Sequence, residues 1–374
     1  MPWSGEGRRK VLLLGEAPGK NEDDDGRQFV GESGRLLEGA LREIGVDMRR
    51  DCWLHNAIVC RPPRNRTPTD KEISHCLPNL VRCVKELRPE VIVPLGAKAV
   101  KSLIGWLWKS DVGAMGRWDG WRIPVQGINA WVCPTWHPSH ILRNREEHSG
   151  RTGATAGRKE PLQELFWEPR LKAAFELGGR PWGKIPDYKS KVRVEMDIMR
   201  AAREVRGIME GARPVAFDYE TNMLKPDSPF ARIVSCAVSD GERAIAYPWH
   251  GAAITATQTL LKSPVPKRGF NIKFEERWTI RMFGHGVHNW QWDGMLAAHA
   301  LDNRRDICSL EFQAFVLLGQ GTWEGPVKAY MKADGSNEEN RIRDLSLQKL
   351  LLYNGMDALV EWEVAEAQRR RFKC

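Results

Sequence analysis

The strongest constraint in this sequence is an alternation of short apolar runs with amphipathic segments across the first half of the chain. Runs such as VLLLG at 11–15 and PEVIVPLG at 89–96 are typical of buried strands, whereas GESGRLLEGALREIG at 31–45 has apolar residues at helical spacing. Alternating strands and helices indicate a parallel β-sheet with helices on both faces. The first half is therefore predicted to be an α/β domain with three layers, αβα.

A Pro- and Lys-rich stretch separates this pattern from a second one. The residues RPWGKIPDYKSKVRVE, at 180–195, have the composition of a linker. We expect a first domain over residues 1–180, a linker over 181–212 and a second domain over 213–374, because 374 residues usually form more than one domain. In the second domain, RPVAFDYET predicts a strand, and ARIVSCAV and RAIAYPW predict a hairpin.

The charge of the chain indicates the kind of partner it binds. It carries 57 Lys and Arg residues against 48 Asp and Glu residues, a net charge of +9. Such an excess favours a polyanion such as DNA, because basic side chains release counterions from phosphates. No apolar run approaches the ~20 residues of a membrane span, and the run behind the basic start is too short for a secretory signal. We therefore expect a cytoplasmic protein that does not bind membranes.

An aromatic ring, an amide and a histidine follow the predicted strands of the first domain. Phe29 lies beyond the strand 11–15, Asn56 lies in the strand pattern 52–60, and His137 follows the strand pattern 131–136. Ligands bind at the carboxyl edge of open α/β sheets, where such strand ends meet. We expect the ring, the amide and the imidazole to share one pocket at this edge.

Three segments carry a resemblance to a known family: GEAPGKNEDDDGRQFVGESGRLL, NAIVCRPPRNRTPTDKEISHC and HPSHILR. In order and approximate spacing they resemble the successive motifs of family 4 uracil-DNA glycosylases, over about residues 10–180. The resemblance implies the fold of that family and its reaction, in which uracil leaves the DNA stack and its glycosidic bond is hydrolysed. It also implies that Phe29 stacks on the uracil, that Asn56 bonds O4 and N3–H, and that His137 donates to O2.

The same resemblance assigns roles to further residues of this domain. Glu22 crowds the 5-position of the base and rejects thymine. Glu16 is the acid nearest to the reaction, because Ala17 stands where the better-known uracil glycosylases carry Asp. Arg143 ends the segment 140–143, which either inserts an apolar wedge into the DNA or begins a helix that packs on the sheet.

Family 4 enzymes also hold a [4Fe–4S] cluster on four cysteines, so the resemblance raises the question of this cofactor. Cys60 and Cys76 occupy the positions of the second cysteine pair. The first pair should precede the opening strand, but no cysteine precedes Cys52. Either the cluster is lost or its ligands come from elsewhere, and we expect no cluster.

Acidic residues recur at suggestive spacings in the second domain. Asp218 and Glu220 in FDYET share one face of a predicted strand, because side chains alternate with period two. Paired carboxylates can hold divalent metal ions through their oxygens. Glu275 follows in the segment NIKFE, and Tyr353 and Asp357 share one face of a predicted helix.

This ordered set resembles the 3′→5′ proofreading exonuclease domain of family A DNA polymerases, a ribonuclease H-like α/β fold with a mixed sheet. The resemblance implies that Asp218, Glu220 and Asp357 ligate Mg²⁺ or Mn²⁺, with Glu275 as the fourth acid where many members have Asp. Tyr353 would orient the attacking water. The polymerase domain that usually follows is not in this sequence, so a separate DNA polymerase is an expected partner, as in phage replication proteins.

These observations lead to two hypotheses of different kinds. The first is a bifunctional enzyme of DNA repair and replication, which excises uracil and degrades DNA from 3′ ends by two-metal-ion hydrolysis. The alternative is that the first domain binds uracil or single-stranded DNA without cleavage and recruits the exonuclease or a polymerase. Base release from uracil-containing DNA separates the two.

Overall fold

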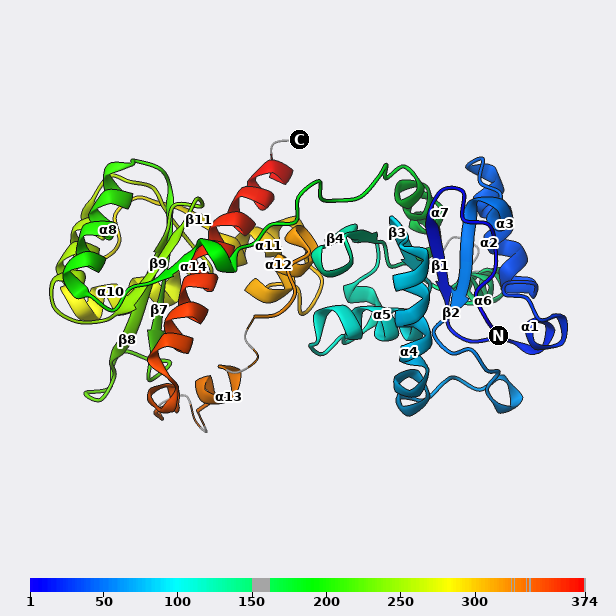
Figure 1. The fold of residues 1–374 in the computed structure, drawn as a ribbon, viewed down its shortest axis with the longest axis horizontal. Coiled ribbons are helices and arrows are strands. Elements are labelled where there is room, and N and C mark those ends of the chain that lie inside the picture. Colours follow the sequence, from blue (N-terminus) through cyan, green and yellow to red (C-terminus); the bar gives the residue numbers. More distant parts are fainter. Residues whose placement is uncertain (150–161, 324, 326, 334, 336–337, 373–374) are drawn as a thin grey trace, which may run out of the picture. The chain divides into compact units, whose positions relative to one another are not determined.

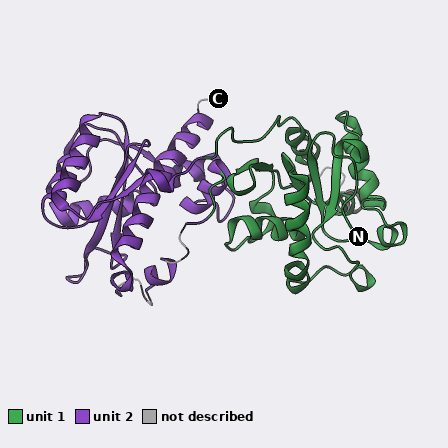
Figure 2. Cartoon of the chain, in the orientation of Figure 1, with its two compact units in different colours: residues 1–185, 319–321 green, residues 186–318, 322–374 purple. Residues whose placement is uncertain are grey.

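The computed structural model describes residues 1–149, 162–323, 325, 327–333, 335 and 338–372 (Figure 1). The chain divides into two compact units, residues 1–185 with 319–321 and residues 186–318 with 322–374 (Figure 2). Each unit has its own β-sheet and its own apolar core. None of the helices among the described residues is long and apolar enough to cross a membrane.

The first unit contains a five-stranded sheet in the order β2-β1-β3-β5-β4. Neighbouring strands are parallel except for β4, which is antiparallel to β5. The strands are β1 (Val11–Gly15), β2 (Cys52–Asn56), β3 (Val91–Pro94), β4 (Ile123–Val125) and β5 (Ala130–Val132). The predicted strand at 11–15 is confirmed, with all five residues buried.

Helices cover both faces of this sheet (Figure 1). One face carries helices that pack on one another through the first core, namely α2 (Glu32–Glu43), α6 (Pro138–Ser149) and α7 (Leu162–Phe175). The other face carries α4 (Asp70–Leu87) and α5 (Ala97–Trp108), while α1 (Lys20–Asp25) and α3 (Met48–Asp51) are short connections. The predicted three-layer αβα arrangement is therefore confirmed.

The second unit contains a six-stranded mixed sheet in the order β11-β10-β7-β8-β9-β6. The three strands β7 (Val215–Thr221), β8 (Ile233–Ser239) and β9 (Ala244–Pro248) are antiparallel, which confirms the predicted hairpin. The flanking pairs are parallel and involve β6 (Val192–Val194), β10 (Lys267–Gly269) and β11 (Trp290–Asp293). A mixed sheet of this kind agrees with the predicted fold class.

Helices also cover both faces of the second sheet. The helices α8 (Ile198–Glu210), α9 (Ala252–Lys262) and α10 (Lys273–Phe283) pack on one face around a shared core. The long helix α14 (Leu347–Phe372) crosses the other face, beside α11 (Gly294–Leu301) and α12 (Leu310–Leu318) (Figure 1). A short helix, α13 (Lys328–Met331), precedes α14.

The linker expected over residues 181–212 is shorter in the structure. Residues 192–194 form β6, which pairs with β9, and residues 198–210 form α8, whose apolar side is buried. The division between the units falls between Ile185 and Pro186. The sequence did not predict β6 and α8. A three-residue strand is too short to show alternation, and the buried residues of α8 are interspersed with several arginines.

A capping box fixes the loop that leads into α4. The Thr69 hydroxyl accepts the Glu72 N–H at 3.3 Å, and Glu72 Oε2 accepts the Thr69 N–H at 2.8 Å. Such a cap stabilises a helix by about 1 kcal/mol. Glu72 also pairs with Arg66 at 2.6 Å, so the cap holds the preceding loop as well as the helix.

The packing of α8 predicts a loss of stability on substitution of Ile208, which is 2% exposed. Ile208→Ala should lower the free energy of unfolding of the second unit by roughly 2–5 kcal/mol, because it leaves a cavity in the core. Denaturant unfolding measures this change. The exposed Arg206 on the same helix is the control, and Arg206→Ala should change stability by less than about 0.5 kcal/mol. Equal effects of the two variants would mean that α8 is not part of this core.

Candidate active sites

The first candidate site lies where strands β1 and β2 end. Gly15 and Asn56 are register partners at the carboxyl ends of these parallel strands, beside a cavity of about 350 Å³. A Cβ on Gly15 would lie 2.3 Å from Asn56 Oδ1 and 2.9 Å from Phe29 Cζ. Glycine therefore allows the amide and the ring to approach the strand end, and both line the cavity together with His137.

Phe29 is held in an uncommon backbone conformation, with φ at 57°. A Cβ on Gly34, in the first turn of α2, would lie 2.1 Å from the Phe29 carbonyl oxygen, and that oxygen accepts a hydrogen bond from Arg49 Nη2 at 3.2 Å. Bulky residues seldom adopt positive φ, and such residues cluster at functional sites. The local structure thus fixes the ring where a flat ligand could cover it.

Glu22 closes the loop that precedes α2. Its Oε2 accepts the Gly19 N–H at 2.9 Å, and its Oε1 accepts the Gly31 N–H at 3.1 Å. Both donors are N-cap residues, of α1 and α2, and unpaired N–H groups at helix starts favour a negative charge. The carboxylate therefore holds the loop and also lines the cavity, while rejection of thymine stays a prediction.

His137 lies at the turn that begins α6. The Ser139 backbone N–H lies 3.2 Å from His137 Nδ1, and the Ser139 hydroxyl lies 2.8 Å from the same atom. Because a backbone N–H can only donate, Nδ1 is the acceptor, and the proton of the neutral ring belongs on Nε2. Burial, together with the charge of Arg143, lowers the pKa of His137 to about 4. The imidazole is therefore neutral near pH 7.

Glu16 and Arg143 line the same cavity. Burial raises the pKa of Glu16, while the positive charges of Lys98 and Arg143 oppose that rise. Within the segment 140–143, Ile141 is fully buried and belongs to the core between the sheet and its helices. This segment therefore begins α6 and packs on the sheet, so an apolar wedge cannot include Ile141.

The cysteines of the first unit differ in their exposure to solvent. Cys60 is exposed and Cys76 is half-buried, whereas Cys52 and Cys133 pack in the apolar core. Burial raises the pKa of the Cys83 and Cys133 thiols to about 12, although a cluster binds thiolates. The absence of a [4Fe–4S] cluster stays a prediction, which depends on the missing first cysteine pair.

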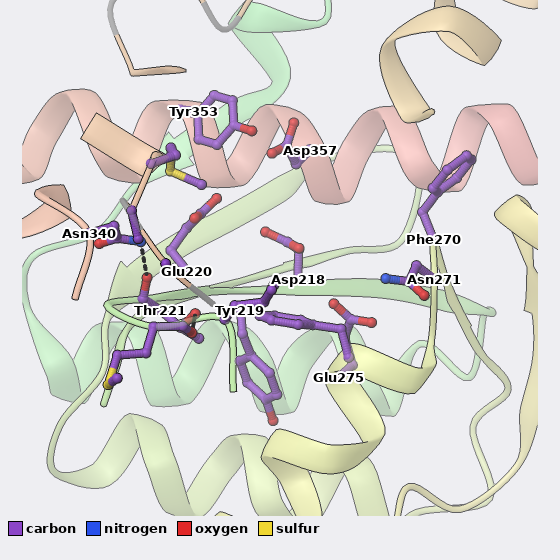
Figure 3. Close-up of a pocket in the computed structure, with 16 residues that line it drawn as sticks. Asp218, Tyr219, Glu220, Thr221, Phe270, Asn271, Glu275, Asn340, Tyr353 and Asp357 are labelled. Carbon is purple, nitrogen blue, oxygen red and sulfur yellow. Dashed lines mark hydrogen bonds between the residues drawn. The ribbon is translucent and has the colours of Figure 1, made fainter. Parts of the chain in front are cut away.

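The second candidate site is formed by β7 and α14 (Figure 3). Asp218 and Glu220 lie two residues apart on one face of β7, and Asp357 projects toward them from α14. One oxygen from each of these three carboxylates lies within 4.8 Å of the others. Tyr353 and Glu275 line the same cavity, of about 630 Å³. Three clustered carboxylates are a donor set that suits Mg²⁺ or Mn²⁺.

Tyr353 and Glu275 differ in how they meet this carboxylate group. Tyr353 lies one helical turn before Asp357, and its hydroxyl points toward that side chain (Figure 3). Glu275 comes from α10, and its Oε2 is buried without a hydrogen-bond partner in the described part of the chain. The structure thus brings all five predicted residues to one cavity, but the close group contains three of the four acids.

Burial opposes the ionisation of these acids. It raises the pKa of Asp218 to about 7. Burial, followed by the charges of neighbouring carboxylates, also raises the pKa values of Glu220 and Glu275, and burial followed by the Asp218 charge raises that of Asp357. Carboxylates this close repel one another when ionised, so a divalent ion would supply the compensating charge and displace protons.

Sequence patterns missed three residues beside this group. Asn354 Nδ2 donates to Asp218 Oδ2 at 2.6 Å, and Trp323 Nε1 donates to Asp357 Oδ1 at 2.6 Å. Glu361 is 5% exposed and lies one helical turn after Asp357. The helical spacing from Asp357 could have indicated Glu361. Trp323 is 34 residues from its partner in the chain, and no local pattern predicts such a contact.

Comparisons with known proteins agree with this division into two units. Residues 2–166 match the family model of the uracil DNA glycosylase superfamily, and residues 196–370 match the model described as 3'-5' exonuclease. The type-4 uracil-DNA glycosylase of Pyrobaculum aerophilum is 40% identical over 146 residues, which cover 38% of this chain and 73% of that protein. The type-4 enzyme of Thermotoga maritima is 40% identical over 150 residues, which cover 39% of this chain and 74% of that protein.

Matches to other proteins are more distant. The DNA polymerase of Bacillus phage SP01 is 25% identical over 144 residues, covering 38% of this chain and 15% of the polymerase. Among solved structures, the catalytic core of RRP6 from Trypanosoma brucei has a TM-score of 0.39 at 15% identity, covering 51% of this chain and 48% of that one. A structure titled "apo form of the nuclease" has a TM-score of 0.38 at 17% identity, and the match covers 49% of this chain and 82% of that chain.

The first unit is thus a uracil-DNA glycosylase domain, and the second is a 3'-5' exonuclease domain, so the chain is a hydrolase. With 40% identity to relatives of which it spans about three quarters, the chain belongs to the type-4 uracil-DNA glycosylase family.

The surroundings of His137 predict an unusual titration. The ring should stay neutral, with its proton on Nε2, until the pH falls to about 4, well below the ~6.5 of an ordinary imidazole. Nitrogen NMR of the ring across this pH range measures both the midpoint and the tautomer. Arg143→Gln should raise the midpoint, because it removes a positive charge that disfavours the imidazolium. A wild-type midpoint near 6.5 would contradict this description of the site.

Proposed function

We propose that the first unit excises uracil from DNA and that the second unit hydrolyses DNA from 3′ ends. The observation that carries the first half is the meeting of Phe29, Asn56 and His137 around one cavity at the strand ends. The second half is supported by the group of Asp218, Glu220 and Asp357. DNA is the common substrate, and the excess of Lys and Arg over Asp and Glu favours its phosphates.

Uracil recognition follows from the chemistry of the cavity. The target nucleotide leaves the stack at a cost of a few kcal/mol, and its base enters the pocket. The Phe29 ring then stacks on the base, while the Asn56 amide donates to O4 and accepts from N3–H. Cytosine presents the opposite donor and acceptor at these two positions, so the same amide mismatches it. Glu22 crowds the 5-position and excludes the methyl group of thymine.

Bond cleavage depends on a neutral donor. As the glycosidic bond breaks, negative charge develops on the uracil, and His137 donates its Nε2–H to O2. The low pKa of His137 keeps this donor uncharged near pH 7. Glu22 already accepts two backbone N–H groups, which leaves Glu16 as the acid of this cavity that orients the attacking water. Arg143, exposed at its rim, contacts the DNA backbone.

Hydrolysis at 3′ ends depends on the carboxylates of the second unit. Asp218, Glu220 and Asp357 would hold the divalent ions, and Glu275 would add a fourth carboxylate from α10. Bound Mg²⁺ or Mn²⁺ activates a water and stabilises the leaving 3′ oxygen. Tyr353 orients that water through its hydroxyl. A separate DNA polymerase as partner stays a prediction.

His137→Ala should lower uracil release by roughly 10²–10³-fold, the usual effect of removing one donor from a developing anion. The measurement is alkali-labile strand breakage of a uracil-containing oligonucleotide, with a chelator present. Asp218→Asn is the matched control and should release uracil at the wild-type rate. Tight binding of uracil DNA by the wild-type protein without base release would instead establish the non-cleaving module.

Asp218→Asn should abolish release of nucleotides from 3′ ends, because it removes one of three carboxylate ligands. The loss should exceed the 10–100-fold that is typical when only an outer-shell partner is removed. Digestion of a 3′-labelled strand with Mn²⁺ or Mg²⁺ measures it. His137→Ala serves as the control with intact exonuclease, and undiminished digestion by Asp218→Asn would reject this metal site.

A further inference from the structure

A buried amide connects the exonuclease carboxylates to the sheet beneath them. Asn354 is fully buried on the side of α14 that faces β7 and β8. Its neighbours along this side of the helix include Leu351 and Ala358, which pack with Ala237 and Ala246 of the strands. An amide in an apolar layer is unfavourable unless all its polar atoms are hydrogen-bonded.

Each polar atom of Asn354 has a partner. The Ser235 hydroxyl donates to Asn354 Oδ1 at 3.0 Å. Asn354 Nδ2 donates to Asp218 Oδ2 at 2.6 Å and lies 3.2 Å from the Asp218 carbonyl oxygen. The orientation of the amide is settled by chemistry, because the backbone carbonyl oxygen of Asp218 can only accept, so the NH₂ group must face Asp218.

Trp323 makes an equivalent contact with the other end of the group. Its Nε1–H donates to Asp357 Oδ1 at 2.6 Å, and its ring packs against the apolar cluster that contains Leu359 and Val360 of α14. Neither donor can give up a proton near neutral pH or ligate a hard cation through nitrogen. Each can only hold one carboxylate oxygen in place and leave the other available.

We propose that Asn354 and Trp323 are positioning residues that set Asp218 and Asp357 in the orientation needed to bind divalent ions. The proposal rests on the proposed exonuclease function. Partners that orient ligands act before any substrate arrives, so their loss weakens metal binding itself, usually by 10–100-fold. The neighbouring positions Leu351 and Ala358 are apolar, so what the amide adds at position 354 is a hydrogen-bond donor to Asp218.

The test measures Mn²⁺ binding by calorimetry in the absence of DNA, alongside the Mn²⁺ dependence of 3′-end digestion. Asn354→Leu, which keeps the approximate shape, should weaken Mn²⁺ binding by about 10–100-fold. Asn354→Asp places a further carboxyl against Asp218 in the same shape and should weaken it more. Trp323→Phe keeps a ring but removes the N–H, and should weaken binding in the same direction.

Gln368 provides a matched control on the same helix. It is fully buried and its amide bonds Gly294 O at 2.9 Å and Gln313 Oε1 at 3.2 Å, with no carboxylate among these partners. Gln368→Met should lower the melting temperature and leave Mn²⁺ affinity unchanged. If Asn354→Leu behaves like Gln368→Met, Asn354 is only a packing residue and the proposal is wrong.

Two further outcomes keep the result decisive. If Asn354→Leu does not fold, Ser235→Ala tests the same hydrogen bonds, because it keeps Asn354 but removes the bond that orients its amide. Unchanged Mn²⁺ affinity in both Ser235→Ala and Trp323→Phe overturns the proposal. If the folded wild-type protein binds no Mn²⁺ and digests no DNA, the proposed exonuclease function itself fails. Uracil release by each variant reports that the first unit is intact.

Discussion

Desolvation of ionisable side chains is the constraint on which both candidate sites depend. In the first unit, burial and a neighbouring arginine keep His137 uncharged near pH 7, which suits the role proposed for it as a neutral donor. In the second unit, burial raises the pKa of Asp218 and its neighbours lie too close to ionise together. Under the proposed function, the same physical effect gives the first site a neutral hydrogen-bond donor and favours a bound cation at the second site.

Local patterns made much of this architecture predictable, and contacts between distant segments made the rest unpredictable. Period-two alternation placed Asp218 and Glu220 on one face, and helical spacing placed Tyr353 with Asp357, as the structure has them. The strand β6 could not be predicted, because its three residues are extended only through their hydrogen-bonded pairing with β9, which is distant in the sequence. Insertion of Ile141 into DNA was open for a similar reason, because only the tertiary fold shows that Ile141 of α6 is buried in the core of the first unit.

Residues that break a local rule are concentrated at the two cavities. Phe29 adopts a positive φ that suits glycine. Its carbonyl oxygen lies where a side chain at position 34 would be, so position 34 must be glycine. Asn354 places an amide in an apolar layer, and Glu275 keeps a buried oxygen without a partner in the described residues. Each feature by itself lowers the stability of the fold, and the packing of the surrounding residues compensates for this loss. Such conflicts between local preference and tertiary structure are expected at sites that were shaped for binding.

The chemistry of the two units determines how they can cooperate on one DNA. Hydrolysis of a glycosidic bond removes the base but leaves every phosphodiester bond intact, whereas an exonuclease begins only at a free 3′ end. The product of the first unit is therefore not a substrate of the second until another activity cuts the strand, unless the uracil lies near an existing end. Under the proposed functions, the covalent connection would raise the local concentration of each site around DNA held by the other. The two proposed reactions also share a requirement, since a turned-out base and an unpaired 3′ end are both departures from the duplex.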